Sequence, residues 1–205
     1  MKKLFALLLV VVCALSMVSC DDGEALATET MDGFMNALVT FDADAMASYL
    51  DDPQAVPEAI KNLDIDVLMS TIPEEQQVYK DYYAKIVDAT IKKMSSITGY
   101  EIKDVASDED GFVYTIAVNE VQDTNVIDTA FSEDAMNDVI TTLVEKGEIT
   151  ETTTEEELMD MIFDELVVMI NDLELKTSAV DKAFYVYEKD GKWVVNAKKS
   201  NIKPN

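Results

Sequence analysis

Histidine and arginine are both absent from this chain of 205 residues, and its two cysteines, Cys13 and Cys20, lie within the first twenty positions. The absence of histidine excludes Ser-His-Asp and Cys-His catalytic arrangements and histidine-based metal sites. The absence of arginine excludes a bidentate guanidinium clamp for phosphate or carboxylate. No cysteine remains after residue 20 for a disulfide framework or a nucleophile, and no glycine-rich nucleotide motif occurs. We therefore predict no cofactor, no metal site and no enzymatic activity.

Positive charge is scarce in the chain. Sixteen lysines stand against 41 acidic residues, which gives a formal net charge of −25 and a pI of about 4.1. Nucleic acid and anionic lipid surfaces would repel such a chain. Its partners are expected to be cationic, neutral or apolar. At 48% hydrophobic residues, the chain can still bury the core of one ordinary domain.

The first twenty residues have the pattern of a secretory signal. Lys2 and Lys3 precede an apolar run of fifteen positions from Leu4 to Val18. A membrane-spanning helix needs about 20 such residues, so the run is more typical of a signal peptide.

The sequence "MVSC" at residues 17–20 resembles the lipobox of bacterial lipoprotein signal peptides. The resemblance implies cleavage between Ser19 and Cys20 and lipidation of Cys20, which would anchor the protein on the outer side of the cell membrane. Loss of Lys2 and Lys3 would then take the charge from −25 to −27. Two alternatives are an ordinary secretory cut that leaves Cys20 as a free thiol, and an uncleaved anchor. The predicted organisation is a signal peptide over 1–19, a short tether over 20–29 and a single domain over 30–205.

Apolar spacing after the tether is helical. It predicts helices over 24–41, 43–50 and 57–70, a longer helix from Pro73 to Ser96, and two more over 132–147 and 154–174. Ser132 is the expected N-cap of the helix over 132–147. "TEEE" at 154–157 forms a capping box for the helix over 154–174.

Two hairpins interrupt the helices. The segments 100–106 and 112–121 are strand-like and meet at Asp110-Gly111, and residues 178–198 form a second hairpin about Asp190-Gly191. The order of elements predicts an α+β fold. Helices would pack on a curved antiparallel sheet built from the two hairpins, with extra helices between them.

Two stretches carry a family resemblance. "FMNALVTFDADAMASYLDD" resembles the opening helix pair of nuclear transport factor 2-like domains in bacterial lipoproteins of unknown function, and "FYVYEKDGKWVVN" resembles their closing hairpin. The resemblance implies a cone-shaped cavity between sheet and helices. Some members of that superfamily are isomerases or dehydratases, but none of their catalytic residues can be matched here.

Aromatic side chains supply candidates for lining such a cavity. Tyr83, Tyr114, Tyr185 and Trp193 are the predicted pocket residues. Tyrosine and tryptophan at helix and strand periods more often belong to the core, so a purely structural role is the competing interpretation.

Acidic residues are concentrated in two places. "SDEDG" at residues 107–111 resembles part of a calcium loop, but a hairpin follows it where a helix should, which favours a solvated turn. Residues 148–174 contain ten acids and no lysine. That segment is expected to be a solvated helix face, with docking of a cationic partner as the sharper alternative.

Three functions are consistent with the sequence. The preferred one is a membrane-anchored, non-catalytic module that binds a small apolar ligand, a peptide or an envelope protein. The second is an isomerase- or dehydratase-like enzyme that uses a buried carboxylate in the cone. The third is a mainly structural accessory protein of the bacterial envelope.

Lipidation of Cys20 is directly testable. Cys20→Ser should leave the precursor uncleaved and block metabolic labelling with a palmitate analogue, because the thioether carries the anchor. Labelling of the mutant at the wild-type level would contradict the prediction.

Overall fold

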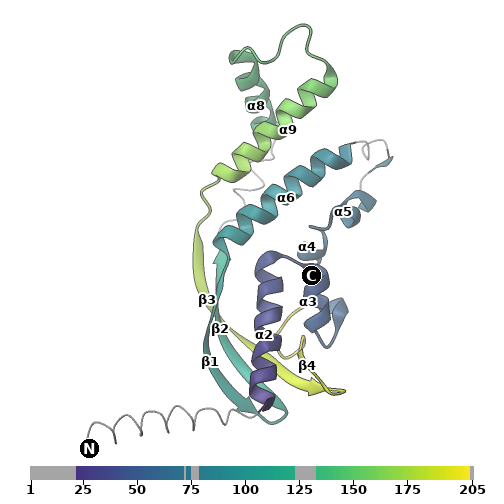
Figure 1. The fold of residues 1–205 in the computed structure, drawn as a ribbon. Coiled ribbons are helices and arrows are strands. Elements are labelled where there is room, and N and C mark those ends of the chain that lie inside the picture. The colour runs from purple at the N-terminus through teal and green to yellow at the C-terminus, as the bar shows by residue number, and fades with distance from the viewer. Residues whose placement is uncertain (1–21, 72, 75–78, 123–132, 204–205) are drawn as a thin grey trace, which may run out of the picture.

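The computed structural model describes residues 22–71, 73–74, 79–122 and 133–203 (Figure 1). Cys20, its cleavage site after Ser19, and the predicted cap Ser132 lie outside these residues. In chain order the elements are α2 (Asp22–Thr40), α3 (Ala43–Tyr49), η1 (Pro53–Ala55), α4 (Glu58–Lys61), α5 (Ile65–Thr71), α6 (Lys80–Ile97), β1 (Tyr100–Asp108), β2 (Gly111–Val121), α8 (Glu133–Glu145), α9 (Glu155–Asp172), β3 (Thr177–Lys189) and β4 (Lys192–Val195).

The predicted α+β class is confirmed. Four antiparallel strands form one sheet in the order β1-β2-β3-β4, and the sheet is not closed into a barrel. Each hairpin pairs within itself, and β2 joins β3 over an unbroken register from Gly111 opposite Tyr187 to Val121 opposite Thr177. The sheet is therefore a meander into which α8 and α9 are inserted. It curves around α2 (Figure 1).

The main core lies between α2 and the inner face of the sheet. Met31, Phe34 and Met35 are at most 1% exposed, and their spacing places them on one stripe of the helix. They belong to one cluster with Tyr114 and Val186 of the central strands. Because alternate strand residues point to one face, the even-numbered positions of β2 and β3 face this core.

A second, smaller core joins α6, α8 and α9 away from the sheet. Val139, Leu143, Ile162, Phe163 and Leu166 are its buried members. The ring of Phe163 stacks on Tyr82 of α6, with ring centroids 4.8 Å apart. In Figure 1, α6, α8 and α9 accordingly project beyond the end of the sheet.

Several boundaries differ from the sequence-based prediction. Helix α2 begins at Asp22, so residues 22–29, predicted as tether, are helical, and Ala27 is fully buried. Helix α6 begins at Lys80 and not at Pro73.

The capping box at Thr154 and Glu157 is present as predicted: Thr154 N–H donates to Glu157 Oε2 at 2.9 Å. This contact, with the Thr154 hydroxyl, lowers the pKa of the Glu157 carboxyl.

The two hairpins turn by different means. Asp190 and Gly191 both have positive φ angles, 53° and 77°, as the predicted Asp-Gly turn requires. In the first hairpin Asp108 pairs with Gly111, so the turn consists of Glu109 and Asp110. Gly111 is the first residue of β2, and its role is close packing, because a Cβ there would overlap the carbonyl oxygen of Val186.

Gly111→Ala tests this close packing. The new methyl would also lie 2.9 Å from the Cα of Tyr187, and neither backbone can move without breaking the ladder. We expect a loss of about 1–3 kcal/mol of unfolding free energy, measured by urea denaturation. Gly99→Ala is the matched control, since its Cβ would make an ordinary contact of 3.6 Å with Asn119. Equal midpoints for the two variants would refute the role assigned to Gly111.

Candidate binding pocket

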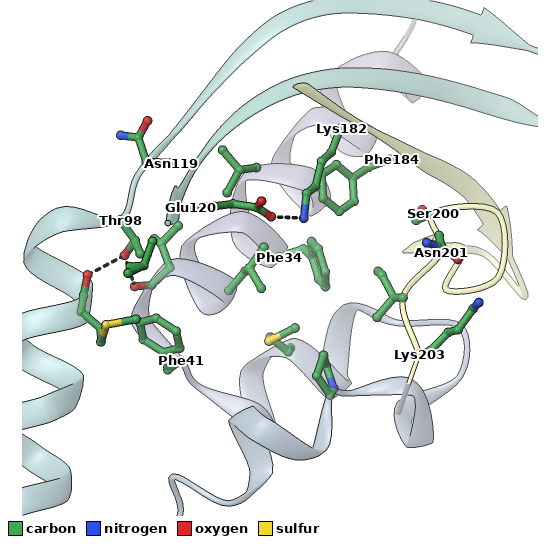
Figure 2. A pocket seen from close by; sticks show the side chains of 18 residues that line it. Phe34, Phe41, Thr98, Asn119, Glu120, Lys182, Phe184, Ser200, Asn201 and Lys203 are labelled. Carbon is green, nitrogen blue, oxygen red and sulfur yellow. Dashed lines mark hydrogen bonds and ion pairs between the residues drawn. The ribbon is translucent and has the colours of Figure 1, made fainter. Parts of the chain in front are cut away.

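A pocket of about 670 Å³ lies where α2 ends and the inner face of the sheet continues (Figure 2). Its walls come from α2 and α3, the end of α6, the adjoining ends of β2 and β3, and the C-terminal tail. The lining residues are Phe34, Leu38, Val39, Phe41, Met46, Pro57, Met94, Thr98, Val118, Asn119, Glu120, Val121, Lys182, Phe184, Ser200, Asn201, Ile202 and Lys203.

The inner wall is apolar and belongs to the main core. The rings of Phe34 and Phe184 pack with centroids 5.8 Å apart, and both residues are less than 5% exposed. Met46 and Val118 complete this wall and are also buried. A ligand that reached it would contact side chains already fixed by core packing.

Two lining residues have left-handed backbones. Phe41 has φ 59° and Asn201 has φ 56°, a region that non-glycine residues rarely occupy. Each follows a helical turn that closes with a backbone bond across it, from Asp42 N–H to Ala37 O at 2.9 Å and from Ile202 N–H to Ala197 O at 2.8 Å. These turns stop the helical segments where they do and place Phe41 and the tail against the pocket.

Polar groups lie toward the rim. Glu120 and Lys182 form an ion pair, and both side chains are partly exposed, at 42% and 45% (Figure 2). The hydroxyl of Thr98 lies 3.1 Å from Val39 O, to which it can donate. Lys203 has no ion pair within the part of the chain that the structure describes. The rim thus combines neutral hydrogen-bonding groups, a charge pair that largely cancels, and the ammonium group of Lys203.

The carboxylate among the lining residues is exposed to solvent. Glu120 is the carboxylate that lines the pocket, and it is both solvent-accessible and paired. Among the described residues no polar or charged residue is buried. The strongly desolvated carboxylate that catalysis in a cone would use is therefore not found in the residues described.

The predicted pocket residues lie elsewhere. Tyr114 is fully buried, and its hydroxyl is 3.0 Å from that of Thr28; burial raises its pKa. Tyr83 packs edge-on to Phe163 in the second core, with centroids 6.2 Å apart.

Trp193 and Tyr185 are also outside the pocket. The ring of Trp193, on β4, lies 5.6 Å from that of Phe112, on β2, across the intervening strand β3, and it packs against the main core. Tyr185 lines a separate small cavity of about 130 Å³, where Lys199 Nζ lies 5.5 Å from its ring. As odd-numbered residues of β3, Tyr185 and Tyr187 point away from the inner face.

Phenylalanines and aliphatic residues were the lining groups that sequence reasoning missed. A usable signal exists in the strands: Val118 and Phe184 share their inward-facing period with the charged Glu120 and Lys182. A charge on the inner face marks the place where helix coverage of a sheet stops.

Neither acidic segment forms a metal site in the described part of the chain, where no cluster of three or more candidate ligands occurs. Asp108 of the calcium-like loop pairs with Lys199 at 2.9 Å, and the hydrogen bond from Lys199 lowers the pKa of the Asp108 carboxyl. On α9 the apolar stripe faces inward as predicted. The acids left exposed on α9 are Glu155, Glu156, Glu157, Asp160, Asp164 and Asp172.

Comparison of the chain with protein-family models, with curated proteins and with solved structures gives no match. No helix among the described residues is long and apolar enough to cross a membrane.

The distribution of acidic charge predicts that salt stabilises the protein by general screening and not by binding at one site. Like charges three or four positions apart on α9 destabilise the helix by about 0.2–0.5 kcal/mol per pair, and salt screens charges beyond roughly 8 Å. Melting temperature should therefore rise smoothly with NaCl, and calcium and magnesium should act alike at matched ionic strength. A saturable response to micromolar calcium alone would contradict this and direct mutagenesis to Asp108 and Asp110.

Proposed function

We propose that the protein is an extracytoplasmic bacterial lipoprotein, anchored through Cys20, whose nuclear transport factor 2-like domain binds a small, mainly apolar ligand without catalysis. The signal-like first nineteen residues and the lipobox-like "MVSC" support the anchor. The α+β fold with a curved sheet is compatible with the family resemblance. The pocket is the single observation that carries the binding function.

The size and lining of the pocket favour a small organic molecule. Ligand sites typically measure about 300–1,000 Å³ and are mainly apolar with a few polar groups, and this pocket, at about 670 Å³, fits both criteria. Its apolar wall provides the gain in free energy on binding. The hydroxyl group of Thr98 and the amide group of Asn201 at the rim suit one neutral hydrogen-bonding group on the ligand.

The charge of the chain restricts the ligand further. At a formal −25, the protein repels anions at long range, and Lys182 is already paired with Glu120. A neutral ligand therefore fits better than a fatty-acid anion. An enzyme at this pocket would have to use the carboxylate of Glu120. Because Glu120 is paired with Lys182 and exposed to solvent, it does not support the enzymatic alternative.

A neutral fluorescent probe tests the pocket. N-phenyl-1-naphthylamine should bind saturably with enhanced emission, and Leu38→Trp should weaken its affinity at least tenfold, because Leu38 lines the pocket from α2 and the larger ring would fill it. Val168→Trp is the matched control, because Val168 lies on α9, is 49% exposed, and is not among the lining residues.

Both variants should keep the wild-type urea midpoint, since neither position is fully buried. Failure of the wild-type protein to bind the probe, or an equal loss of affinity in the two variants, would overturn the assignment of this pocket.

A further inference from the structure

The outer edge of β3 is only partly covered. Strand β4 pairs with Val186–Lys189. At the next residue, Asn196 N–H donates to Tyr185 O at 2.8 Å, and Tyr185 N–H donates to Ser200 Oγ at 2.9 Å. Between Thr177 and Ala183, the backbone N–H and C=O groups that point to this edge have no hydrogen-bond partner among the described residues.

The direction of the uncovered groups follows from Tyr185. Successive residues of a strand point their N–H and C=O groups to opposite edges. Ala183, Asp181, Ala179 and Thr177 therefore share the outward direction of Tyr185, whereas the even-numbered residues bond to β2. The edge presents the backbone donors and acceptors of four residues in a row.

This edge has less protection than the other edge, because its inward-facing charge, Lys182, is already paired with Glu120. The register of β1 against β2 shifts between Ile102 and Asp104, which places Lys103 at an irregularity, and a bulge with lysine disfavours edge pairing. The β2–β3 register has no such break. The outward residues Ala179 and Ala183 are small and exposed, so a second chain can approach closely.

The free edge begins where the tail meets the pocket. Lys182 and Phe184 of β3 line the pocket next to Ser200 and Asn201 of the tail (Figure 2). A strand added beside Thr177–Ala183 would lie in line with β4. Every second side chain of that strand would project toward the pocket mouth.

We propose that the outer edge of β3, residues 177–183, binds an extended peptide of neutral or basic composition by strand addition. Main-chain hydrogen bonds would give affinity, and alternate apolar side chains at the pocket mouth would give selectivity. A second copy of the chain fits poorly, because each copy carries a formal −25.

A defined peptide tests the edge. The probe is acetyl-Lys-Val-Thr-Val-Thr-Val-Lys-amide, and the control peptide has proline in place of the central valine. Amide hydrogen exchange of the protein, followed residue by residue by NMR, should slow at least tenfold at residues 177, 179, 181 and 183 when the probe binds. Residues 178, 180 and 182 should be unaffected, because β2 already protects them.

Absence of binding by the probe, equal binding of the proline peptide, or protection confined to α8 and α9 would each overturn the proposal. If these same amides are already protected from exchange in the protein without peptide, because two copies pair through the edge of β3, the edge serves self-association. That result would also overturn the proposal.

Paired substitutions at Ala179 separate the edge from the pocket. Ala179→Pro removes one outward N–H and keeps the β2 ladder, as proline is tolerated on strand edges, whereas Ala179→Thr keeps the N–H. Peptide affinity should fall at least tenfold in the first variant and stay within about twofold in the second. Binding of the naphthylamine probe should survive in both, so the edge and the pocket can fail independently. A folded Ala179→Pro protein, verified by circular dichroism, with unchanged peptide affinity would refute the edge site.

Discussion

The packing of α2 onto the inner face of the sheet is the contact on which the other features of the fold depend. The helix buries Met31, Phe34 and Met35 against the central strands, and each such side chain contributes roughly 1.5–3 kcal/mol on burial. Helix α2 stops at Thr40, however, while β2 and β3 continue past it. The inner face beyond that point carries Val118, Glu120 and Lys182, and it is there that the pocket opens. β4, four residues long, likewise leaves half of β3 uncovered. The pocket and the free edge thus have one cause, which is that the sheet is longer than the elements that cover it.

Charge is distributed unevenly on this framework. The acidic segment 148–174 has no lysine, whereas residues 176–203 carry seven lysines and three acids. Two of these lysines are paired with acids from the first hairpin, Lys182 with Glu120 and Lys199 with Asp108. Ion pairs hold the helical extension only weakly: Lys85 and Asp164 join α6 to α9 at 3.2 Å but are 47% and 69% exposed, and exposed pairs contribute about 0–1 kcal/mol. The stacked rings of Tyr82 and Phe163 and the buried aliphatic residues around them are the stronger link.

Local signals in the sequence predicted most helices and strands. The features that these signals missed are set by packing between residues that are far apart in the chain. Periodicity located the helices and both hairpins, and the capping box and the Asp190-Gly191 turn were correct because each depends on neighbours in the chain. The first hairpin was also correct, but its turn lies one residue before the predicted Asp110-Gly111, and Gly111 is required instead by the backbone of β3, about 75 positions away along the chain. The resemblance implied a cavity between sheet and helices, but its lining was missed for the same kind of reason. Tyrosine and tryptophan were preferred as lining groups for their chemistry, but the lining is set by where α2 ends and by the tail that meets β3.

The lining of the pocket also has an energetic consequence. The pocket is open to solvent, so water enters it past the polar rim when no ligand is bound. Water next to Phe34, Met46 and Phe184 finds few hydrogen-bond partners, and well-bound waters need two to four of them. Displacing that water with apolar groups is favourable, while the hydroxyl and amide groups of the rim keep their own partners. This difference between a poorly hydrated wall and a well-hydrated rim gives the pocket its preference for a ligand with an apolar body.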